Sequence, residues 1–379
     1  MDTLYRAKPY IPSVTHKWIL NKFESILRTG ALIQGQHVGE FEQEACHMFN
    51  VKNAIATTSC GTGLETVLLA SGIKNKRFIV PTQTFAASVN CIIRTGNTPL
   101  IVDVDSETQC LSLDIIKENM TDDMGGVIMV HMSGLITPEM EEIEKYCKDN
   151  DLFLVTDDAH TYGAKLGDRF AGSFGDAGVF SFYPSKIITT AEGGLITTND
   201  DELAEKCRVV RNHGTRRNDG EFQGLDYGYT CDMPSTNYRM SEFHAVLGLA
   251  QNKYLNSFIE RRNEIAKIYD ERLSKVDWLQ TPFKDDNIKQ TYWQYIVKIT
   301  DDKRDRTTEL WRLLDEYKIP TANAYSPLCH EQEIYKDYLS PNGYKNSEEF
   351  ITKIFSLPMY VEMTDEQVHY ICRTIEQLW

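Results

Sequence analysis

Several features are missing from this sequence of 379 residues. No apolar run approaches the roughly 20 residues that a membrane-spanning helix needs, and the opening MDTLYRAKPYIPS contains no apolar segment like that of a secretory signal. The nine cysteines are scattered singly, without a C-x-x-C pair or a metal-like cluster with histidine. We therefore expect a cytoplasmic protein with reduced thiols, no membrane association and no bound metal.

Basic residues are also scarce. The 40 Lys and Arg residues face 55 Asp and Glu residues, which gives a net charge of −15. This charge argues against a general nucleic-acid-binding protein and against docking on an anionic membrane. We therefore expect small-molecule substrates, and any anionic ligand would have to be held by local groups that work against the overall field.

The length and the hydrophobic pattern predict an α/β protein with more than one domain. A chain of 379 residues exceeds the usual size of a single hydrophobic core. Short apolar runs alternate with longer amphipathic ones, as in a βαβ architecture, and these runs are NAIATTSC, RFIVP, TPLIVDVD, GGVIMVHM and LFLVTDDAH. Runs this short fit strands that are covered on both faces, so we expect a mostly parallel central sheet.

The pattern changes after Ser241. Helical periodicity then continues over many turns, which indicates a long connecting helix or a bent pair of helices. Beyond it, the strand-like YWQYIVKI and the helix-like DRTTELWRLLDEY suit a smaller α+β domain. We predict a large domain over residues 20–250 and a small C-terminal domain over residues 251–379, joined by residues 1–19.

One lysine stands out in FSFYPSKIITTAEGGLITTND, residues 180–200. Lys186 lies between Ser181 and the glycine pair Gly193-Gly194. It is either a solvated surface charge, the usual fate of lysine, or an amine held in a pocket for covalent chemistry with a carbonyl. The stretch alone does not decide, so the rest of the chain must supply what such an amine needs.

The commonest carbonyl compound that a protein lysine holds is pyridoxal phosphate, which needs three further groups. Its ring nitrogen needs a carboxylate, and Asp157 follows the apolar strand in LFLVTDDAH. Its phosphate needs backbone N–H groups at a helix N-terminus, which TTSCGTGLETVLL offers at Gly61 and Gly63. Its ring needs a flat or apolar partner, such as Phe85 in PTQTFAAS.

Each of these signals also has an ordinary explanation: a carboxylate that starts a turn, a glycine turn before a helix, and a phenylalanine in the core. Their order is more specific. Phosphate cradle, aromatic ring, carboxylate and lysine follow one another in the sequence, each at the end of a separate strand. That layout is typical of fold-type I pyridoxal-phosphate enzymes.

The chain resembles the DegT/DnrJ/EryC1/StrS family of sugar aminotransferases from end to end. The blocks that match in the right order are LIQGQHVGEFEQE, TTSCGTGLETVLLASGI, IVPTQTFAASVNCIIRTGNTPLIVDVD, SFGDAGVFSFYPSKIITTAEGGLITTND, RNHGT, NYRMSEFHAVLGLAQ and FSLPMY. The block around Lys186 and the NYRMSE block are the most specific. The resemblance implies a fold-type I α/β enzyme with pyridoxal 5'-phosphate as its cofactor.

The resemblance also implies roles for single residues. Lys186 would hold the cofactor aldehyde and afterwards shuttle the proton, and Asp157 would pair with the pyridine nitrogen. His160, where members of the family carry His or Gln, would lie near the cofactor ring, and Phe85 would stack on it.

For the phosphate, the resemblance implies Gly61, Thr62 and Ser181 as binding residues. Asn237 would reach the same phosphate from the neighbouring subunit, because the active sites of the family are built at a dimer interface. A homodimer with shared active sites is therefore expected.

Five further positions can be interpreted. Arg239, in the NYRMSE block, would lie near the cofactor on the substrate side, and His330 would belong to a substrate-side loop or be an ordinary surface histidine. Asp158 stands where the family commonly has a small apolar residue, and since neighbouring side chains on a strand point to opposite faces, we expect it to point away from the cofactor. Trp293 and Trp379 are interpreted as core residues of the small domain.

The activity implied by the resemblance is transfer of an amino group from an amino acid, such as L-glutamate, to a keto sugar carried on a nucleoside diphosphate. Two alternatives use the same fold. Some members are pyridoxamine-dependent dehydratases, but those carry histidine at the lysine position, so Lys186 argues against this activity. Others are linked to regulation, and there the fold would serve as a sensor.

Overall fold

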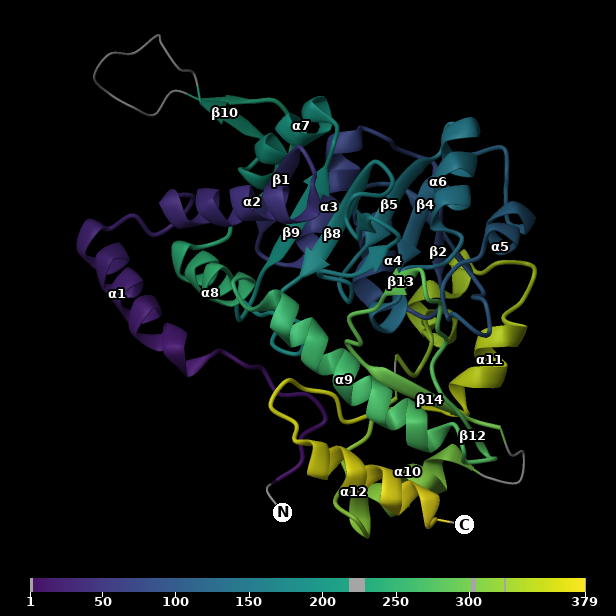
Figure 1. Ribbon diagram of the computed structural model, residues 1–379. Coiled ribbons are helices and arrows are strands. Elements are labelled where there is room, and N and C mark those ends of the chain that lie inside the picture. Colours follow the sequence, from purple (N-terminus) through teal and green to yellow (C-terminus); the bar gives the residue numbers. More distant parts are fainter. Residues whose placement is uncertain (1–2, 218–228, 301–304, 324, 379) are drawn as a thin grey trace.

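The structure is a computed structural model that describes residues 3–217, 229–300, 305–323 and 325–378 (Figure 1). Its centre is a seven-stranded sheet in the order β1-β9-β8-β5-β4-β2-β3. The strands are β1 (Asn53–Thr57), β2 (Arg77–Pro81), β3 (Thr98–Val102), β4 (Met124–Val130), β5 (Phe153–Asp157), β8 (Ala177–Ser181) and β9 (Gly194–Thr198). Only β9 runs antiparallel to its neighbours, so the prediction of a mostly parallel sheet is confirmed.

Helices cover both faces of this sheet, because alternate apolar side chains of each strand point to opposite sides. Ile55 packs in the cluster that contains α3, α4 and α7, while Ala54 and Ala56 pack in the cluster that contains α2, α6 and α8. The covering helices are α2 (Gln36–Phe49), α3 (Cys60–Ser71), α4 (Ala86–Arg94), α6 (Met140–Asp149), α7 (Asp201–Arg211) and α8 (Glu242–Asn252).

After Ser241 the chain forms a bent pair of helices, α8 and α9 (Leu255–Leu273), which was one of the two expected forms. The far half of α9 contributes to a separate hydrophobic cluster (Figure 1). The elements around that cluster are β12 (Leu279–Gln280), β14 (Tyr295–Ile299), α10 (Arg306–Asp315), β15 (Ile354–Leu357) and α12 (Asp365–Glu376).

Other segments link the two clusters. The amide of Met359 donates to the Arg6 carbonyl at 3.1 Å, whereas α1 (Ser13–Thr29) packs against α8. Tyr335 and Tyr344 return to the cluster of the large sheet. The division at residues 250 and 251 therefore stays a prediction, and Trp379 lies outside the described residues.

The remaining elements are short. They are α5 (Leu113–Glu118), η1 (Met132–Gly134), β6 (Lys165–Leu166), β7 (Arg169–Phe170), β10 (Thr215–Arg217), β11 (Tyr229–Cys231), β13 (Ile288–Lys289), η2 (Cys329–Glu331), η3 (Glu333–Tyr338) and α11 (Lys345–Ile351). Within the described ranges, no helix is both long and apolar enough to cross a bilayer. The same part of the chain contains no group of three or more His, Cys, Asp or Glu side chains placed to hold a metal ion.

Candidate active site

Asp157 ends β5 with its carboxylate buried at the edge of the sheet where the parallel strands end. Its Oδ2 accepts a hydrogen bond from the Ser88 hydroxyl at 2.7 Å, and its Oδ1 accepts from the Ala159 amide at 3.1 Å and lies 3.6 Å from the Cys60 thiol. Burial raises the pKa of Asp157, while these hydrogen bonds act in the opposite direction. The carboxylate is thus fixed in place and ready to pair with a cation.

Lys186 lies in the loop between β8 and β9, with its Nζ 4.1 Å from the centre of the Trp293 ring. The Trp293 indole donates in turn to the Ser185 carbonyl at 2.8 Å, which ties the ring to the lysine loop. Burial lowers the pKa of Lys186 to about 8, although nearby Cys60 and Asp157 raise it. A substantial fraction of the amine is therefore uncharged, and nucleophilic, at mildly alkaline pH.

The His160 ring lies beside two other rings, which are themselves neighbours with centroids 6.4 Å apart. It stacks on Trp293 with centroids 3.8 Å apart and on Tyr325 with centroids 5.9 Å apart. Its Nδ1 accepts from the Ser133 amide at 3.3 Å, so its proton is on Nε2, which donates to the Tyr325 hydroxyl at 2.9 Å. Burial, together with the charge of Lys186, lowers the pKa of His160 well below its usual range, so the ring is neutral.

A possible phosphate cradle lies at the N-terminus of α3. The Ser59 side chain caps this helix by accepting from the Thr62 amide at 3.2 Å, and the Thr62 hydroxyl accepts in return from the Ser59 amide at 3.0 Å. Gly61, in the first turn, lies where the amides and the dipole of a helix favour an anion.

Gly194 brings Ser181 to this cradle. The two residues pair across β8 and β9, and a Cβ added to Gly194 would come 2.7 Å from the Cys60 nitrogen and even closer to the Ser59 carbonyl. The glycine is therefore required for β9 to lie directly against the start of α3. Thus Ser181, Thr62 and Gly61 converge at the helix N-terminus.

Phe85 immediately precedes α4 and is 64% exposed, with its ring centroid 6.3 Å from that of Tyr325. An exposed phenylalanine ring beside a group of other aromatic rings is available to a flat ligand. Its exposure excludes the alternative explanation that Phe85 is a core residue.

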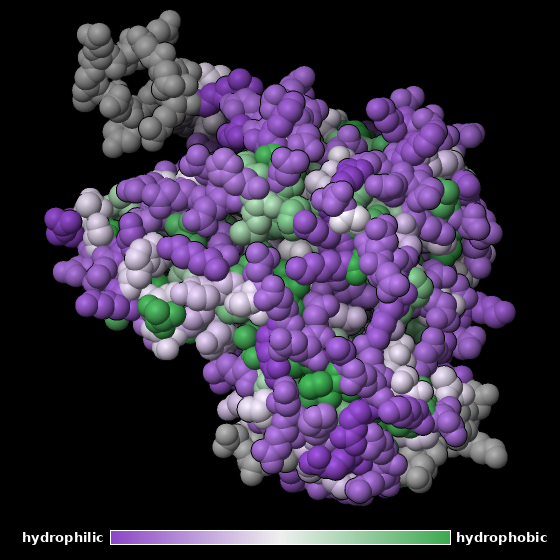
Figure 2. All heavy atoms as spheres, in the orientation of Figure 1, coloured by the Kyte–Doolittle hydropathy of each residue, from purple (hydrophilic) through white to green (hydrophobic). Residues whose placement is uncertain are grey.

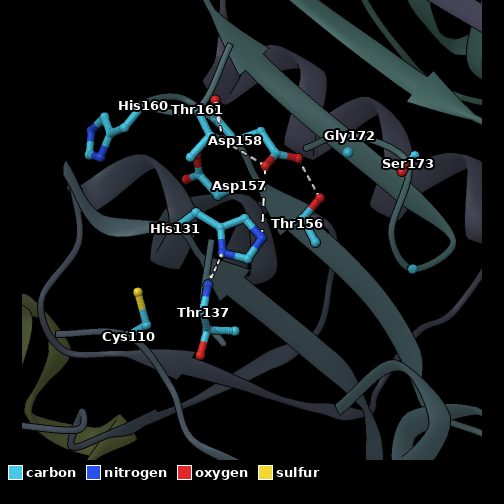
Figure 3. Close-up of polar contacts among 12 residues, drawn as sticks. Cys110, His131, Thr137, Thr156, Asp157, Asp158, His160, Thr161, Gly172 and Ser173 are labelled. Atoms are coloured by element: carbon cyan, nitrogen blue, oxygen red, sulfur yellow. Dashed lines mark hydrogen bonds and ion pairs between the residues drawn. The ribbon is translucent and has the colours of Figure 1, made fainter. Parts of the chain in front are cut away.

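Asp157 and Asp158 point to opposite sides, as expected from strand alternation. The contacts of Asp158 go to Thr156 and Thr161, away from Ser88 and Cys60, and Figure 3 shows the two carboxylates apart. Only Asp157 therefore faces the site.

The contacts of the other three sequence-predicted residues lie outside the group around Lys186. Asn237 is exposed, and its backbone pairs with Asn212. The Arg239 guanidinium donates to the Asn212 side chain at 2.6 Å. Neither contact joins the group around Lys186.

His330 is held by packing contacts. Its Nδ1 lies 2.7 Å from the Thr82 hydroxyl, its ring stacks on Tyr344 at 3.8 Å, and its Nε2 lies 3.4 Å from a Glu348 carboxylate oxygen. These contacts account for the residue without a substrate, so its role on the substrate side stays a prediction.

Three residues at the site were not found from the sequence. Trp293 was interpreted as core of the small domain, and this was wrong, because its ring contacts His160 and Lys186 and packs against the cluster of the large sheet. Tyr325 and Ser88 were not singled out. Only Ser88 carried a usable signal, since it lies one helical turn after Phe85 and therefore near the same strand end.

These groups fit pyridoxal phosphate. A fixed buried carboxylate, an amine with a lowered pKa, an exposed aromatic ring and a hydroxyl-rich helix N-terminus are the four features that the cofactor needs, and one edge of the sheet collects them. The fold and the site together define a fold-type I pyridoxal-phosphate enzyme.

Comparison with known proteins narrows this class. The model of the DegT/DnrJ/EryC1/StrS aminotransferase family matches residues 14–376. A GDP-perosamine synthase of Escherichia coli O157:H7 is 32% identical over 371 residues, which cover 98% of each chain. A pleiotropic regulatory protein of Geobacillus stearothermophilus is 30% identical over 373 residues, which cover 95% of this chain and 94% of its own.

Comparison with solved structures gives the same fold. The structure of DesI in the presence of its TDP-sugar product superposes with a TM-score of 0.86 at 26% identity, and the match covers 99% of this chain and 93% of the other. The chain belongs to the DegT/DnrJ/EryC1/StrS aminotransferase family and is a pyridoxal-phosphate-dependent aminotransferase.

The contact between Gly194 and the cradle leads to a first prediction. Gly194→Ala should weaken cofactor binding by at least about tenfold, because the added methyl group would push β9 and Ser181 away from the start of α3. Fluorescence titration of the apoprotein with pyridoxal phosphate measures the change.

Gly39→Ala is the matched control. Gly39 lies in α2 with nothing within 4 Å of an added Cβ, so the substitution should leave cofactor affinity unchanged and add roughly 0.5–1 kcal/mol of stability. Wild-type affinity in Gly194→Ala would show that the cradle does not depend on this close approach.

Proposed function

We propose that this enzyme transfers the amino group of L-glutamate to a keto sugar carried on a nucleoside diphosphate. The observation that carries the transferase chemistry is the placement of Lys186, a half-buried amine over Trp293 that interacts with the fixed carboxylate of Asp157. The nucleotide-linked sugar is supported by the relatives, among them the GDP-perosamine synthase and the DesI structure with a TDP-sugar.

When bound, pyridoxal phosphate supplies an aldehyde that exchanges between amines and a ring that delocalises the electrons left when a proton leaves the adjacent carbon. Lys186 would hold this aldehyde in the resting enzyme. Its amine, whose pKa burial lowers to about 8, would also accept the proton from the donor Cα and give one back at the carbon that carried the aldehyde. The same amine acts in the opposite direction when the keto sugar accepts the amino group.

The surrounding residues keep the reacting groups in place. The Asp157 carboxylate keeps a proton on the ring nitrogen, since an opposite charge stabilises the protonated form. Gly61, Thr62 and Ser181 bind the phosphate at the helix N-terminus, and Phe85 and His160 hold the ring. Because His160 donates its proton to Tyr325, the Tyr325 hydroxyl hydrogen remains free to donate to a substrate oxygen.

Incubation with L-glutamate alone tests the function. A transaminase should convert the bound cofactor to pyridoxamine phosphate and release one 2-oxoglutarate per site, and a nucleotide-linked keto sugar should then restore the original absorbance. No conversion by glutamate or another amino acid would contradict the proposal.

A sensor of the same fold is the second candidate, because one relative is a pleiotropic regulatory protein. A sensor would bind the cofactor and sugar without converting them. A dehydratase is disfavoured by Lys186, which stands where such enzymes carry histidine.

We further infer a homodimer with shared active sites. Three apolar side chains of α1, Val14, Leu20 and Leu27, are 73%, 66% and 69% exposed, and Figure 2 shows a hydrophobic group over α1 on an otherwise mainly hydrophilic face. Leu20 and Leu27, seven residues apart, share one face of α1, and exposed apolar side chains on one face suit contact with a second copy. Asn237 is also exposed and would complete the cradle of the partner.

Mixing two inactive variants tests this arrangement. Lys186→Ala and Asn237→Asp should each be inactive, because the first removes the amine and the second places a carboxylate against the phosphate. If Asn237 serves the partner, one site of each mixed dimer collects both lesions and the other none, so activity should recover toward half of wild type per mixed dimer.

The rival arrangement is realistic, because the Tyr238 carbonyl accepts from the Thr58 amide at 2.9 Å and so places Asn237 near the cradle of its own chain. Each site of a mixed dimer would then carry one lesion, and mixing would restore nothing. Differently tagged chains confirm that subunits have exchanged, and full exchange without activity would rule out the shared site.

A further inference from the structure

A buried polar group lies behind the cofactor carboxylate, on the other side of β5. Its centre is Asp158, which is fully buried together with His131 at the end of β4. The Asp158 Oδ1 accepts from the Thr161 hydroxyl at 2.8 Å, and its Oδ2 accepts from the Thr156 hydroxyl. Figure 3 shows these contacts and the line to His131, with Asp157 outside the group.

The surroundings of Asp158 contain few titratable groups. His131 Nε2 lies 3.9 Å from Asp158 Oδ1, and Asp157 is the neighbour along the chain. The β8 side contributes Gly178, where an added Cβ would come 2.7 Å from Asp158 Oδ2, and the Gly172 backbone gives a further hydrogen bond. Two glycines thus leave room for the Asp158 carboxyl group, and the His131 ring approaches it from the end of β4.

The turn after β4, which carries His131, and the turn after β5, which carries Asp158, also contact each other at the active site. His131 and Asp158 meet behind the sheet, whereas the Ser133 amide, two residues after His131, donates to Nδ1 of His160, two residues after Asp158. The Thr137 amide donates to His131 Nδ1 at 3.4 Å, so the proton of the neutral His131 ring is on Nε2, facing Asp158. The rear approach, at 3.9 Å, is longer than a hydrogen bond, but it lies only two residues along each turn from the hydrogen bond between Ser133 and His160.

We propose that Asp158 is a positioning residue for the reaction at Lys186, since it ties the turn that carries His160 to β4 and β5 and thereby fixes the place and the tautomer of the His160 ring. This inference rests on the proposed aminotransferase function. Asp158 itself touches neither Lys186 nor the groups around Asp157 Oδ2. Its effect passes through Thr161 and His131 to His160.

Protonation of Asp158 makes the proposal testable. Burial raises the pKa of Asp158 to about 7 and lowers that of His131 to about 3, so at pH 6 the carboxyl group is mostly protonated and the ring is neutral. As the pH rises through 7, Asp158 acquires a charge beside Asp157 and opposite the His131 Nε2–H. Because the folded-state pKa is raised, this carboxyl group favours folding at low pH, and that contribution is lost as the pH rises through 7.

The absorbance of the holoprotein, titrated from pH 6 to pH 9 without substrate, tests the role. Asp158→Asn keeps a polar group of the same shape but cannot ionise, so its spectrum should match wild type at pH 6 and depart from it above pH 7. Asp158→Ala removes the link altogether, so its spectrum should differ at every pH. We also expect its rate of reaction with L-glutamate to fall about tenfold through kcat, with KM little changed.

Asp176→Asn is the matched control. Asp176 is also a carboxyl group with a pKa raised by burial, but it binds the Leu154 amide at the opposite end of β5. Its variant should lower the melting temperature and leave both the spectrum and the rate as in wild type.

The proposal would be overturned if both Asp158 variants had the same spectra and rates as Asp176→Asn at every pH. A failure of the proposed function would look different. If the wild type did not react with glutamate, the spectra recorded without substrate would still test the role of Asp158.

Discussion

Lys186→Ala should abolish covalent attachment of pyridoxal phosphate and reduce the reaction with glutamate by about 10²–10⁴-fold, the range for loss of a positioned acid–base group. Lys186 combines partial burial, a pKa of about 8 and an Nζ 4.1 Å from the Trp293 ring centre. Borohydride reduction followed by peptide mapping should place the cofactor on the Lys186 peptide of the wild type, and the variant should carry none.

Lys165→Ala is the matched control, because its Nζ also lies 4.1 Å from an aromatic ring centre, that of Phe170, but away from the site. It should remain yellow and active. Label on any lysine other than Lys186 would show that the assignment is wrong. Capture of pyridoxal phosphate by wild-type apoprotein should also accelerate as the pH rises from 6 to 8, because a larger fraction of the Lys186 amine is then uncharged.

Much of the large sheet could be predicted from the sequence, because its strands are short apolar runs bounded by turns and need both faces covered. RFIVP and LFLVTDDAH contain β2 and β5, and GGVIMVHM covers all of β4 except its first residue. The residues at the ends of these strands converge because parallel strands end at one edge. The order of motifs along the chain was therefore enough to bring Asp157, Phe85 and the α3 cradle to one site.

The rest of the site depends on segments that are distant in sequence. Trp293 and Tyr325 reach His160 from about 130 and 165 residues further along the chain, and no local pattern encodes that packing. An aromatic residue beside the apolar run YIVKI has the same local signature as a core residue, which is why Trp293 was misassigned.

Asp158 is a second case in which the sequence predicted only part of the structure. Strand alternation correctly predicted its direction. The pocket that receives it could not be predicted, because Thr161, His131 and the two glycines come from a turn and from other strands.

The two adjacent carboxylates allow a direct comparison, with Asp157→Asn as the second large effect. The amide can still accept from the Ala159 amide, so the variant should bind some cofactor, but it cannot carry the negative charge that keeps the ring nitrogen protonated. Loss of one preorganised electrostatic group at a reaction centre typically costs about 10²–10³-fold in rate, or about 2.7–4 kcal/mol. We expect a loss of this size in the reaction with glutamate, measured by stopped-flow absorbance at saturating cofactor.

Asp158→Asn at pH 6 is the appropriate comparison, because both substitutions remove one carboxyl group from the end of β5 and both positions are buried. Asp158 is mostly protonated at that pH, so its amide variant keeps the neutral charge and the shape of the native side chain. It should therefore retain most of the rate while Asp157→Asn loses nearly all of it. Equal losses would show that the carboxylate facing Ser88 has no special relation to the ring nitrogen, and that the division of β5 into a cofactor face and a structural face is wrong.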